Sequence, residues 1–543
     1  MKKITGGEAV VKALSFLNVD TIFGIPGVHN LAIYAALSNS KIHHVTGRHE
    51  QEVGFMADGY ARTSGCVGVA LVISGPGLTN ILTAMGEAFH EAIPLLVIST
   101  NNASRHLTGR SGKLHELAQS NTMVRSVAKE SRRVPCTEAI IPFLIEAYHL
   151  AQSGRPAPVH LEIPLDLLQQ KIVKPTDNFF RSLTAAFAPP SKNANPQSLH
   201  QAATLLQKAN QPMILVGGGA WQAATNIRHL AEKLAAPVML TPAAKGTLDD
   251  EHPLCLGTRH HFPAVRRYLQ TADVLLAVGS ELTEDLYGNP PAFKGTLIQI
   301  DRDASVFERG VLRGIELLTD ADTAVAGLLE HVSAVSGRSE PLSKKVKDVK
   351  AAADKELTQL FTYPDLDMIC RRLHEMRRAL PTDVILACDS TRPAYVAFSE
   401  FAAHQPRSFV FPCGYGTLGM ALPAAIGAKL AHPQRSVCVL AGDGGFQFSM
   451  AALGTACQQS LNIPVVICND HGFGEIREHE KAHHFKRLIA VDLKNPAFDS
   501  LAAAYGIPYY HIGAKDDLTP ALIEALTLKA PALIEVESVN SNT

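Results

Sequence analysis

The sequence of 543 residues lacks the features that mark a membrane, secreted or nucleic-acid-binding protein. It contains no apolar run of about 18 residues, the length that a membrane-spanning helix needs. The first residues, MKKITGGEAV, lack the apolar stretch of a secretory signal peptide. The 50 Lys and Arg residues are balanced by 51 Asp and Glu residues, which gives a net charge of -1. We therefore expect neither a membrane nor a nucleic acid as a partner.

The spacing of the cysteines gives no sign of a disulfide framework either. The nine cysteines are scattered along the chain, and no two have the Cys-x-x-Cys spacing. An odd number without paired spacing argues against a disulfide framework. Free buried thiols are typical of a reducing compartment, so we expect a cytoplasmic protein. Short repeats and low-complexity tracts are absent as well, which leaves an ordinary globular composition, 46% hydrophobic and 19% charged.

Short apolar runs alternate with longer helical patterns along the whole chain, which is typical of parallel sheets with crossover helices. The chain is too long for one core, and the runs fall into three blocks. The sequence therefore predicts an α/β fold of three doubly wound parallel-sheet domains, at 1–172, 190–335 and 360–543. Polar segments at 172–196 and 333–350 are predicted to be linkers.

Two predicted strands end in acidic side chains. The run VVIC leads into Asn469 and Asp470, and the run VCVL leads into Gly-Asp-Gly-Gly at 442–445. Asp443 and Asp470 are 27 positions apart, which is enough for one crossover helix between neighbouring parallel strands. Both carboxylates are therefore expected at one sheet edge, where oxygen ligands suit Mg²⁺ and glycines let a phosphate approach. Taken alone, Gly-Asp-Gly also fits a simple turn.

The pairing of these strand ends resembles the cofactor motif of thiamine-diphosphate-dependent enzymes, in which Gly-Asp-Gly is followed by Asn-Asn or Asn-Asp. The resemblance implies that thiamine diphosphate and Mg²⁺ are the cofactors. It makes Asp443 and Asp470 side-chain ligands of Mg²⁺, assigns a third bond to the carbonyl of Gly472, and places Gly444 and Gly445 at the diphosphate. The family more often has Asn at the position of Asp470, so this chain would bring one more negative charge.

The first block carries further matching motifs. GRHEQEVGFMADGYAR is similar to the segment with the family's catalytic glutamate, which falls on Glu50. A carboxylic acid bonded to N1′ of the aminopyrimidine favours the imino tautomer, whose nitrogen takes a proton from thiazolium C2. SGPGLTN matches the turn beside the pyrimidine and brings Asn80 to the cofactor. GRPAPVHLEIPLDLL closes the block as in acetolactate-synthase-like members.

In the third block, CGYGTLGMALPAAIGAKLA is similar to the segment that supports the bent cofactor. The resemblance places Leu418 under the two rings and the Gly416 carbonyl at the 4′-amino group. It also implies diphosphate contacts for Ser390 and Thr391. The domain order of the family is pyrimidine-binding, central and diphosphate-binding. Its cofactor lies between the first domain of one chain and the third domain of another, which implies a homodimer or a dimer of dimers.

The substrate prediction depends on the loops around this site. GIPGVHN, SGKLHELAQSNTMV and DHGFGEIREHE are similar to motifs of acetolactate-synthase-like decarboxylases, including the 5-guanidino-2-oxopentanoate type. His115 takes the place of a Gln over the cofactor and could move protons at neutral pH. Glu475, with Glu478 nearby, faces the substrate and could pair with a guanidinium or ammonium tail. These features predict a decarboxylase for a small 2-oxo acid with a cationic tail.

Alternatives stay open for each of these residues and for the whole chain. His115 also fits a hydrogen-bonded structural histidine, and Glu475 a solvated residue at a helix start. The second function is an acetolactate synthase that joins two 2-oxo acids, although His479 stands where those enzymes commonly carry Trp. A catalytically inactive regulatory subunit is the alternative of another class, and the intact Glu50 and Asp443 argue against it.

Two segments of the central block bear on a bound nucleotide. LVGGGAW at 215–221 lacks the Gly-x-Gly-x-x-Gly spacing, which favours a tight strand-to-helix turn over a dinucleotide site. Flavin-carrying acetolactate synthases usually show a run resembling Arg-Phe-Asp-Asp-Arg, whereas ELTEDLYGNPP stands at 281–291 here. Bound FAD is therefore not expected.

Overall fold

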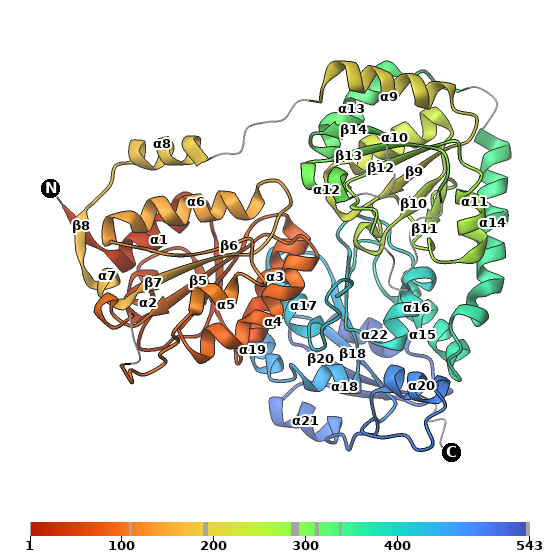
Figure 1. Ribbon diagram of the computed structural model, residues 1–543. Helices are drawn as coiled ribbons and strands as arrows, with labels where there is room; N and C mark the ends of the chain where they lie inside the picture. The colour runs from red at the N-terminus through yellow and green to blue at the C-terminus, as the bar shows by residue number, and fades with distance from the viewer. Residues whose placement is uncertain are drawn as a thin grey trace.

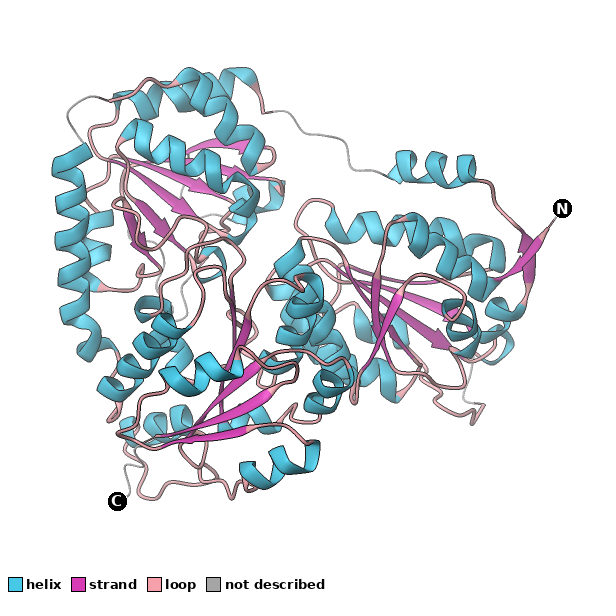
Figure 2. Cartoon of the chain, turned by 180° about the vertical axis from the view of Figure 1, so that it is seen from behind, coloured by secondary structure: helices cyan, strands magenta, loops and turns pink. Residues whose placement is uncertain are grey.

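The computed structural model describes residues 2–107, 111–187, 194–283, 293–309, 314–335 and 339–538. Within these residues the chain forms three α/β domains, each built on a six-stranded parallel sheet with helices on both faces (Figures 1 and 2). The predicted fold class is thereby confirmed. The domain boundaries at 1–172, 190–335 and 360–543 stay predictions.

The first domain has the strand order β3-β2-β4-β5-β7-β6. A short antiparallel pair, β1 and β8, joins the beginning of the chain to the segment that follows this domain. The strands are β1 (Lys3–Thr5), β2 (Thr21–Gly24), β3 (His43–Thr46), β4 (Gly68–Val72), β5 (Leu95–Asn101), β6 (Glu130–Arg133), β7 (Val159–Pro164) and β8 (Lys171–Val173). The α-helices are α1 (Gly6–Phe16), α2 (Leu31–Leu37), α3 (Glu50–Ser64), α4 (Pro76–His90), α5 (Ser120–Val124), α6 (Ile140–Gln152) and α7 (Leu165–Gln169), and the short 3-10 turns are η1 (Ser104–His106) and η2 (Thr137–Ala139).

The central domain has the order β11-β10-β9-β12-β13-β14, which is the doubly wound order of dinucleotide-binding folds. Its strands are β9 (Pro212–Val216), β10 (Val238–Leu240), β11 (Cys255–Gly257), β12 (Val274–Val278), β13 (Thr296–Asp301) and β14 (Gly314–Leu318). Its helices are α9 (Pro196–Lys208), η3 (Gly218–Ala223), α10 (Ala224–Leu234), η4 (Pro242–Ala244), α11 (Pro263–Leu269), α12 (Ala304–Arg309) and α13 (Ala321–His331).

The third domain has the order β16-β15-β17-β18-β20-β19, which repeats the order of the first domain when each is counted from its own first strand. Its strands are β15 (Ile385–Cys388), β16 (Phe409–Val410), β17 (Val437–Gly442), β18 (Pro464–Asn469), β19 (Tyr509–Ile512) and β20 (Ala532–Glu537). Its helices are α15 (Leu366–Ala379), α16 (Arg392–Glu400), α17 (Ala421–Ala431), α18 (Asp443–Gln447), α19 (Ala452–Gln458), α20 (Gly474–Ala482), α21 (Phe498–Tyr505) and α22 (Thr519–Ala525).

Shared apolar cores join the domains to one another. One core combines the α3–α4 face of the first domain with the α17–α19 face of the third, and another joins the central domain to α15 and α16. Where α3 meets α17, a Cβ at Gly59 would lie 2.1 Å from the Ala424 carbonyl oxygen. Only a glycine allows so close a helix contact, which fixes the first domain against the third.

Both predicted linkers contain more structure than their composition indicates. The segment 172–196 includes β8 and the helix α8 (Asp177–Phe187), whose buried Phe180 stacks on Phe16 with ring centroids 5.0 Å apart. Most of the segment 333–350 belongs to α14 (Ser339–Leu360). In α14 the apolar residues recur at helical spacing, and Val346 and Ala353 are buried. The helices in these segments were not predicted because proline, serine and lysine masked their apolar faces.

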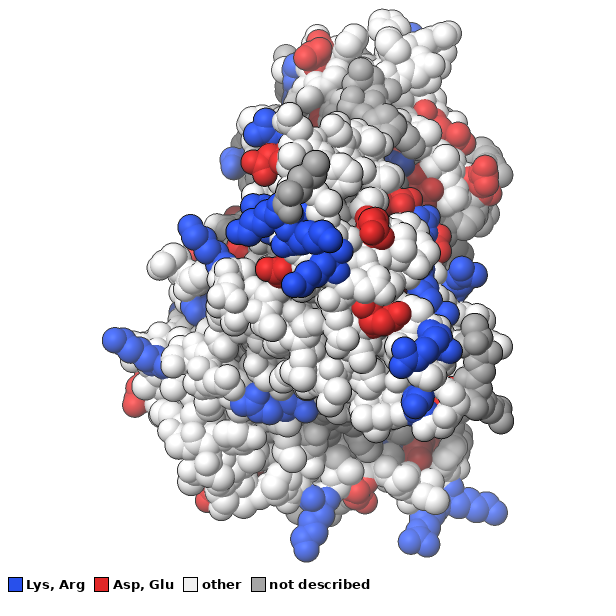
Figure 3. Space-filling model, turned by 90° about the vertical axis from the view of Figure 1, so that its left-hand side faces the viewer, with Lys and Arg blue, Asp and Glu red and all other residues white. Residues whose placement is uncertain are grey.

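The face formed mainly by the first domain carries side chains of both charges. Figure 3 shows several basic side chains gathered near its centre, with acidic side chains beside them. In the part of the chain that the structure describes, no helix combines the length and apolar character needed to cross a membrane.

Candidate active site

The strand order of the third sheet reverses between β15 and β17, and ligands of open parallel sheets bind at such a switch point, beyond the carboxyl ends of the strands. β15 leads into Asp389, Ser390 and Thr391, and β17 ends at Gly442. A Cβ at Gly442 would lie 2.8 Å from Thr391 Oγ1, so the two strand ends pack directly on each other. The predicted diphosphate residues are thereby brought to one edge of the sheet.

The three predicted metal ligands lie together at this edge. Asp443 is 1% exposed and Asp470 is 7% exposed. The Gly472 N–H donates to Asp443 Oδ2 at 2.9 Å, and the Asp470 nitrogen lies 3.5 Å from Asp443 Oδ1. Burial raises the pKa of Asp443 to about 6, and the neighbouring Asp470 carboxylate acts in the same direction. A divalent cation would relieve the repulsion between two such carboxylates, so this donor set fits Mg²⁺.

Asn495 was not singled out from the sequence, yet it connects the two strand ends. Its Nδ2 donates to Asp443 Oδ2 at 2.7 Å and to Asn469 Oδ1 at 2.8 Å. Gln447 Nε2 donates to Asn495 Oδ1 at 2.9 Å. Asn495 and the Gly472 N–H both bond Oδ2 of Asp443, whereas Oδ1 makes the longer contact with the Asp470 nitrogen at 3.5 Å and is the oxygen better placed to meet a cation. Such hydrogen bonds around a ligand orient it toward the metal.

Gly444 and Gly445 lie in the first turn of α18, where neighbouring groups leave no room for side chains. A Cβ at Gly444 would lie 2.9 Å from an aromatic ring, and one at Gly445 would lie 2.7 Å from Asp389 Oδ2. Next to them, the Ser390 and Tyr395 hydroxyls are 2.6 Å apart. Close packing therefore explains why both positions are glycines. The contacts of Gly444, Gly445 and Ser390 with a diphosphate stay predictions.

The loop that precedes α17 holds Gly416 and Leu418. Gly416 has a φ of +68°, a conformation that suits glycine, and among the described residues, its chain neighbours aside, no atom lies within 4 Å of where its Cβ would be. Leu418 is half-buried. The Gly419 N–H anchors the loop on Asp389, whose pKa burial raises to about 6. The loop thus presents backbone to open space beside the strand ends, as a cofactor support requires.

Glu50 is the first residue of α3 and carries the carboxylate predicted to be catalytic. Asn80 Nδ2, from the first turns of α4, donates to Glu50 Oε2 at 2.9 Å. Glu50 is half-buried, and its Oε1 lies 3.4 Å from where a Cβ of Gly77 would be. The structure therefore brings the two predicted residues of the first domain together and leaves one oxygen of the carboxyl group unused by Asn80.

His115 lies against the Ser-Gly-Pro-Gly turn that precedes α4. Its backbone has a φ of +58°, and a Cβ at Gly75 would lie 2.9 Å from the His115 Cα. The ring of His29 stands edge-on to the His115 ring at 5.6 Å. His29 is 4% exposed, its Nε2 lies 3.3 Å from Asn102 Oδ1, and its Nδ1 has no hydrogen-bond partner among the described residues. Sequence reasoning missed His29 because no spacing links position 29 to position 115.

Glu50 and the loop with Gly416 lie toward opposite ends of α4. Glu50 lies beside Asn80 near the start of α4, whereas the Gly414 N–H donates at 2.7 Å to Glu91, the residue that follows α4. At 1.5 Å per residue, the helix between these two levels rises by about 15 Å. The loop with Gly416 therefore lies at the far end of α4 from Glu50.

Glu475 lies in the first turn of α20, directly after the loop of the predicted metal ligands. Its Oε1 lies 3.3 Å from His479 Nε2. Its Oε2 is buried and has no hydrogen-bond partner among the described residues. The neighbouring Glu478 differs, because Lys481 Nζ lies 3.0 Å from its carboxylate. Among the described residues, Glu475 is thus the carboxylate of this helix that has a buried oxygen without a hydrogen-bond partner.

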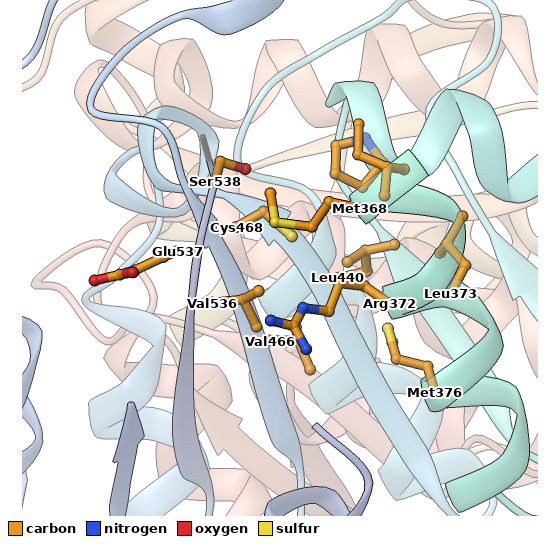
Figure 4. Close-up of a pocket in the computed structure, with 12 residues that line it drawn as sticks. Met368, Arg372, Leu373, Met376, Leu440, Val466, Cys468, Val536, Glu537 and Ser538 are labelled. Atoms are coloured by element: carbon orange, nitrogen blue, oxygen red, sulfur yellow. The ribbon is translucent and has the colours of Figure 1, made fainter. Parts of the chain in front are cut away.

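The pocket in Figure 4 is not part of this cluster. It lies between α15 and the strands β17, β18 and β20, and Met368, Leu373 and Met376 line it with Arg372. The guanidinium of Arg372 is used by Glu375 and by the Gly513 carbonyl. The free volume of about 10 Å³ holds one water at most. We therefore assign no substrate to this pocket.

Family models match each of the three domains. They are described as the thiamine pyrophosphate enzyme N-terminal TPP binding domain at residues 4–122, the central domain at 199–328 and the C-terminal TPP binding domain at 393–536. A relative with 37% identity covers 98% of the chain. The chain belongs to the thiamine pyrophosphate enzyme family. The resemblance inferred from the motifs is therefore confirmed, and thiamine pyrophosphate is the same cofactor as thiamine diphosphate.

The similar members of this family have two kinds of activity in their names. The probable 2-ketoarginine decarboxylase AruI of Pseudomonas aeruginosa is 37% identical over 98% of this chain and 94% of its own. The acetolactate synthase large subunit of Lactococcus lactis is 31% identical over 98% and 92%. The acetolactate synthase of Arthrospira platensis is 30% identical over 99% and 94%. This thiamine pyrophosphate enzyme therefore belongs among decarboxylases and acetolactate synthases.

A solved structure supports the fold of this thiamine pyrophosphate enzyme. The thiamine diphosphate-dependent 4-hydroxybenzoylformate decarboxylase of Rhodococcus jostii RHA1 matches with a TM-score of 0.83 over 99% of this chain and 100% of the other. At 22% identity the similarity concerns the fold alone.

The central domain gives a structural reason for its glycine run. A Cβ at Gly217 would lie 2.1 Å from the Gly279 carbonyl oxygen, so the glycine lets the ends of β9 and β12 pack together. A 3-10 turn, η3, follows at once, which confirms the predicted strand-to-helix turn. Residues 284–291 of the segment that argued against FAD lie outside the described residues.

Proposed function

We propose that the chain is a Mg²⁺- and thiamine-diphosphate-dependent decarboxylase of a 2-oxo acid with a cationic tail, of the 5-guanidino-2-oxopentanoate (2-ketoarginine) type. The observation that carries this proposal is the buried, unpaired Oε2 of Glu475 beside the predicted metal loop. A guanidinium or ammonium tail would supply the missing hydrogen-bond donor and the opposite charge. The relative named as a probable 2-ketoarginine decarboxylase supports the same substrate class.

The residues at the switch point fit the cofactor pair. Asp443, Asp470 and the Gly472 carbonyl would hold Mg²⁺, and the Gly416–Leu418 loop would support the aminopyrimidine. When bound, thiamine diphosphate supplies a carbon nucleophile and an electron sink for cleavage of the bond to the carboxylate. Glu50, held through Oε2 by Asn80, would use its other oxygen to carry the proton shared with the pyrimidine N1′.

His115 is the proposed proton donor to the carbon that loses CO₂. His115 lies over the turn that begins α4, the same helix whose Asn80 holds Glu50, which supports placing both groups on the pyrimidine side of the proposed site. His29, buried behind it and bonded to Asn102, would keep the His115 ring in place. An imidazole ring can both accept and donate a proton, as this step requires.

We also propose that a second copy of the chain completes the site, in a homodimer or a dimer of dimers. The supporting observation is the separation of Glu50 and Gly416 along α4. Both groups must contact one aminopyrimidine ring, so Glu50 of one copy would serve the Gly416 loop of the other. The isologous contact of a two-fold dimer creates two such sites.

Replacing Glu475 by Gln should reduce kcat/KM for 2-ketoarginine by about 10- to 150-fold, the value of a charge-assisted hydrogen bond of roughly 1.5–3 kcal/mol. A neutral 2-oxo acid of similar length should keep its rate, because its tail makes no such bond. Glu478→Gln is the matched control, since it removes the same charge from the same helix but from a carboxylate already paired with Lys481. Steady-state CO₂ release measures all three proteins, and equal losses on both substrates would contradict the proposal.

The acetolactate synthase reaction is the second candidate. The acetolactate synthases of Lactococcus lactis and Arthrospira platensis match nearly the whole chain, which favours carboligation of two 2-oxo acids as the alternative outcome. Against it, His479 rather than Trp follows the metal loop, and its ring nitrogen lies 3.3 Å from Glu475.

A further inference from the structure

Asp470 is negatively charged, whereas the family more often has a neutral Asn at this position. The charge lies in a site that is almost closed to water. The Asp470 side chain is 9% exposed, and Asp443 lies next to it. A Cβ at Gly474 would lie 1.9 Å from Asp470 Oδ2, so the carboxylate lies directly against the start of α20. Two buried carboxylates without compensation would cost several kcal/mol per ion.

A buried arginine meets this carboxylate. Arg392, at the start of α16, is 6% exposed, and its Nη2 donates to Asp470 Oδ2 at 2.8 Å. Its Nη1 donates at 2.7 Å to Asp365, whose side chain is fully buried. Arg477 adds a second positive charge, with Nη1 3.6 Å from Asp470 Oδ2. The guanidinium of Arg392 therefore bridges one fully buried carboxylate, Asp365, and one that is almost closed to water, Asp470.

We propose that Arg392 is a positioning residue that makes Asp470 act toward the cation as an asparagine does in related enzymes. By holding Oδ2, Arg392 neutralises the additional charge and leaves Oδ1 as the single oxygen offered to the metal. This inference rests on the proposed Mg²⁺ site and adds to it a pair of residues, Arg392 and Asp470, that depend on each other.

The pairing has a consequence that the sequences of relatives alone would not predict. An asparagine at position 470 would have to turn its oxygen to the cation and its NH₂ group to Arg392, which has only N–H donors to offer. Asp470→Asn should therefore impair metal binding even though it installs the residue common in the family. Once Arg392 is replaced by Met, the amide no longer meets the close donor at 2.8 Å, and the remaining Arg477 Nη1 lies farther away, at 3.6 Å from Asp470 Oδ2. Asn then becomes the better residue.

The test compares the wild type, Arg392→Met, Asp470→Asn and the double variant. The readout is the Mg²⁺ concentration that gives half-maximal thiamine diphosphate binding, followed by calorimetry without substrate. Each single substitution should raise this concentration about 10-fold or more, as the loss of a group that orients a metal ligand does. In the Arg392→Met background, Asp470→Asn should lower this concentration instead of raising it. Asp365 loses its ion pair with Arg392 in both proteins that carry Arg392→Met. The cost of that loss therefore cancels when these two proteins are compared with each other.

The outcomes separate this inference from the function on which it rests. Additive effects of the two substitutions, or normal Mg²⁺ binding by Asp470→Asn, in a wild type that needs Mg²⁺ would overturn the role of Arg392 and leave the proposed function intact. A wild type that binds thiamine diphosphate without Mg²⁺ would overturn both. If Arg392→Met does not fold, Arg392→Gln takes its place, since its amide carries no charge and can present an oxygen to the NH₂ group of the Asp470→Asn side chain.

Discussion

Glu50→Gln is expected to lower kcat by about 100-fold or more while thiamine diphosphate binding stays close to that of the wild type. Gln keeps the shape of the side chain and can still meet Asn80, which contacts Oε2 at 2.9 Å. It cannot carry the proton that the pyrimidine N1′ shares, and acid–base groups of this kind contribute about 10²- to 10⁴-fold. Rates of CO₂ release and calorimetric binding of the cofactor measure the two effects separately.

Asn80→Ala provides the control for Glu50. It removes the hydrogen bond that orients the carboxyl group but keeps the acid, so its loss of kcat should be smaller than that of Glu50→Gln. If Glu50→Gln stays within about threefold of the wild type, well below the usual contribution of an acid–base group, another residue carries the proton and the assignment is wrong.

Asp443→Ala should abolish the stabilisation of the protein by thiamine diphosphate and Mg²⁺. In the wild type, both ligands together at a hundredfold excess over Kd should add about 3 kcal/mol to the free energy of unfolding. Asp443 is the residue on which the Gly472 N–H and Asn495 converge, so its loss removes a ligand and frees the loop that carries another. Thermal unfolding with and without the ligand pair gives the result, and each protein without ligands serves as its own reference. An unchanged shift in Tm for Asp443→Ala would disprove its role.

The two inactive variants also test the proposed subunit arrangement when they are unfolded and refolded together. In a mixed dimer, the Glu50→Gln chain supplies an intact Asp443 and the Asp443→Ala chain supplies an intact Glu50. One of the two sites is then complete, and random pairing should restore about a quarter of the wild-type activity. Activity that does not exceed that of the separate variants would place both residues in the same chain's site.

The site could be predicted where strand geometry determines it. Asp443 and Asp470 are far apart in the sequence, but β17 and β18 are parallel neighbours, with Gly442 paired to Cys468. Parallel register places the next residues of both strands at the same edge, so their meeting follows from the pattern of strand and crossover helix. The same reasoning brings Thr391 to Gly442, because β15 is the other neighbour of β17.

Residues that reach the site from loops or helix starts could not be found in this way. Asn495 comes from the segment after α20, and nothing about a single amide in a polar loop marks it as a partner of Asp443. Arg392 follows Thr391 at the start of α16, where an arginine is more often exposed, and only the fold shows it buried between Asp365 and Asp470. Tertiary contacts decide both cases, and no local pattern encodes them.

The fold class could be predicted from the sequence, but the order of the strands in each sheet could not. Alternating apolar runs and helical patterns indicate parallel sheets, but the strand orders, which repeat in the first and third domains and differ in the central one, depend on how helices pack on each sheet. α14 was missed because the lysines between Leu342 and Ala353 are typical of a solvated linker, although the apolar residues among them recur at the spacing of a helix.

The most direct test of the account is a substrate panel on the wild type with Mg²⁺ and thiamine diphosphate, in which CO₂ and acetolactate are measured in the same reaction. The panel contains 2-ketoarginine, a neutral 2-oxo acid of similar length, and pyruvate. The account predicts that 2-ketoarginine has the highest kcat/KM, by about tenfold or more over the neutral acid, and that its CO₂ release is matched by an aldehyde. Fastest turnover of pyruvate with accumulation of acetolactate would contradict it and identify the chain as an acetolactate synthase.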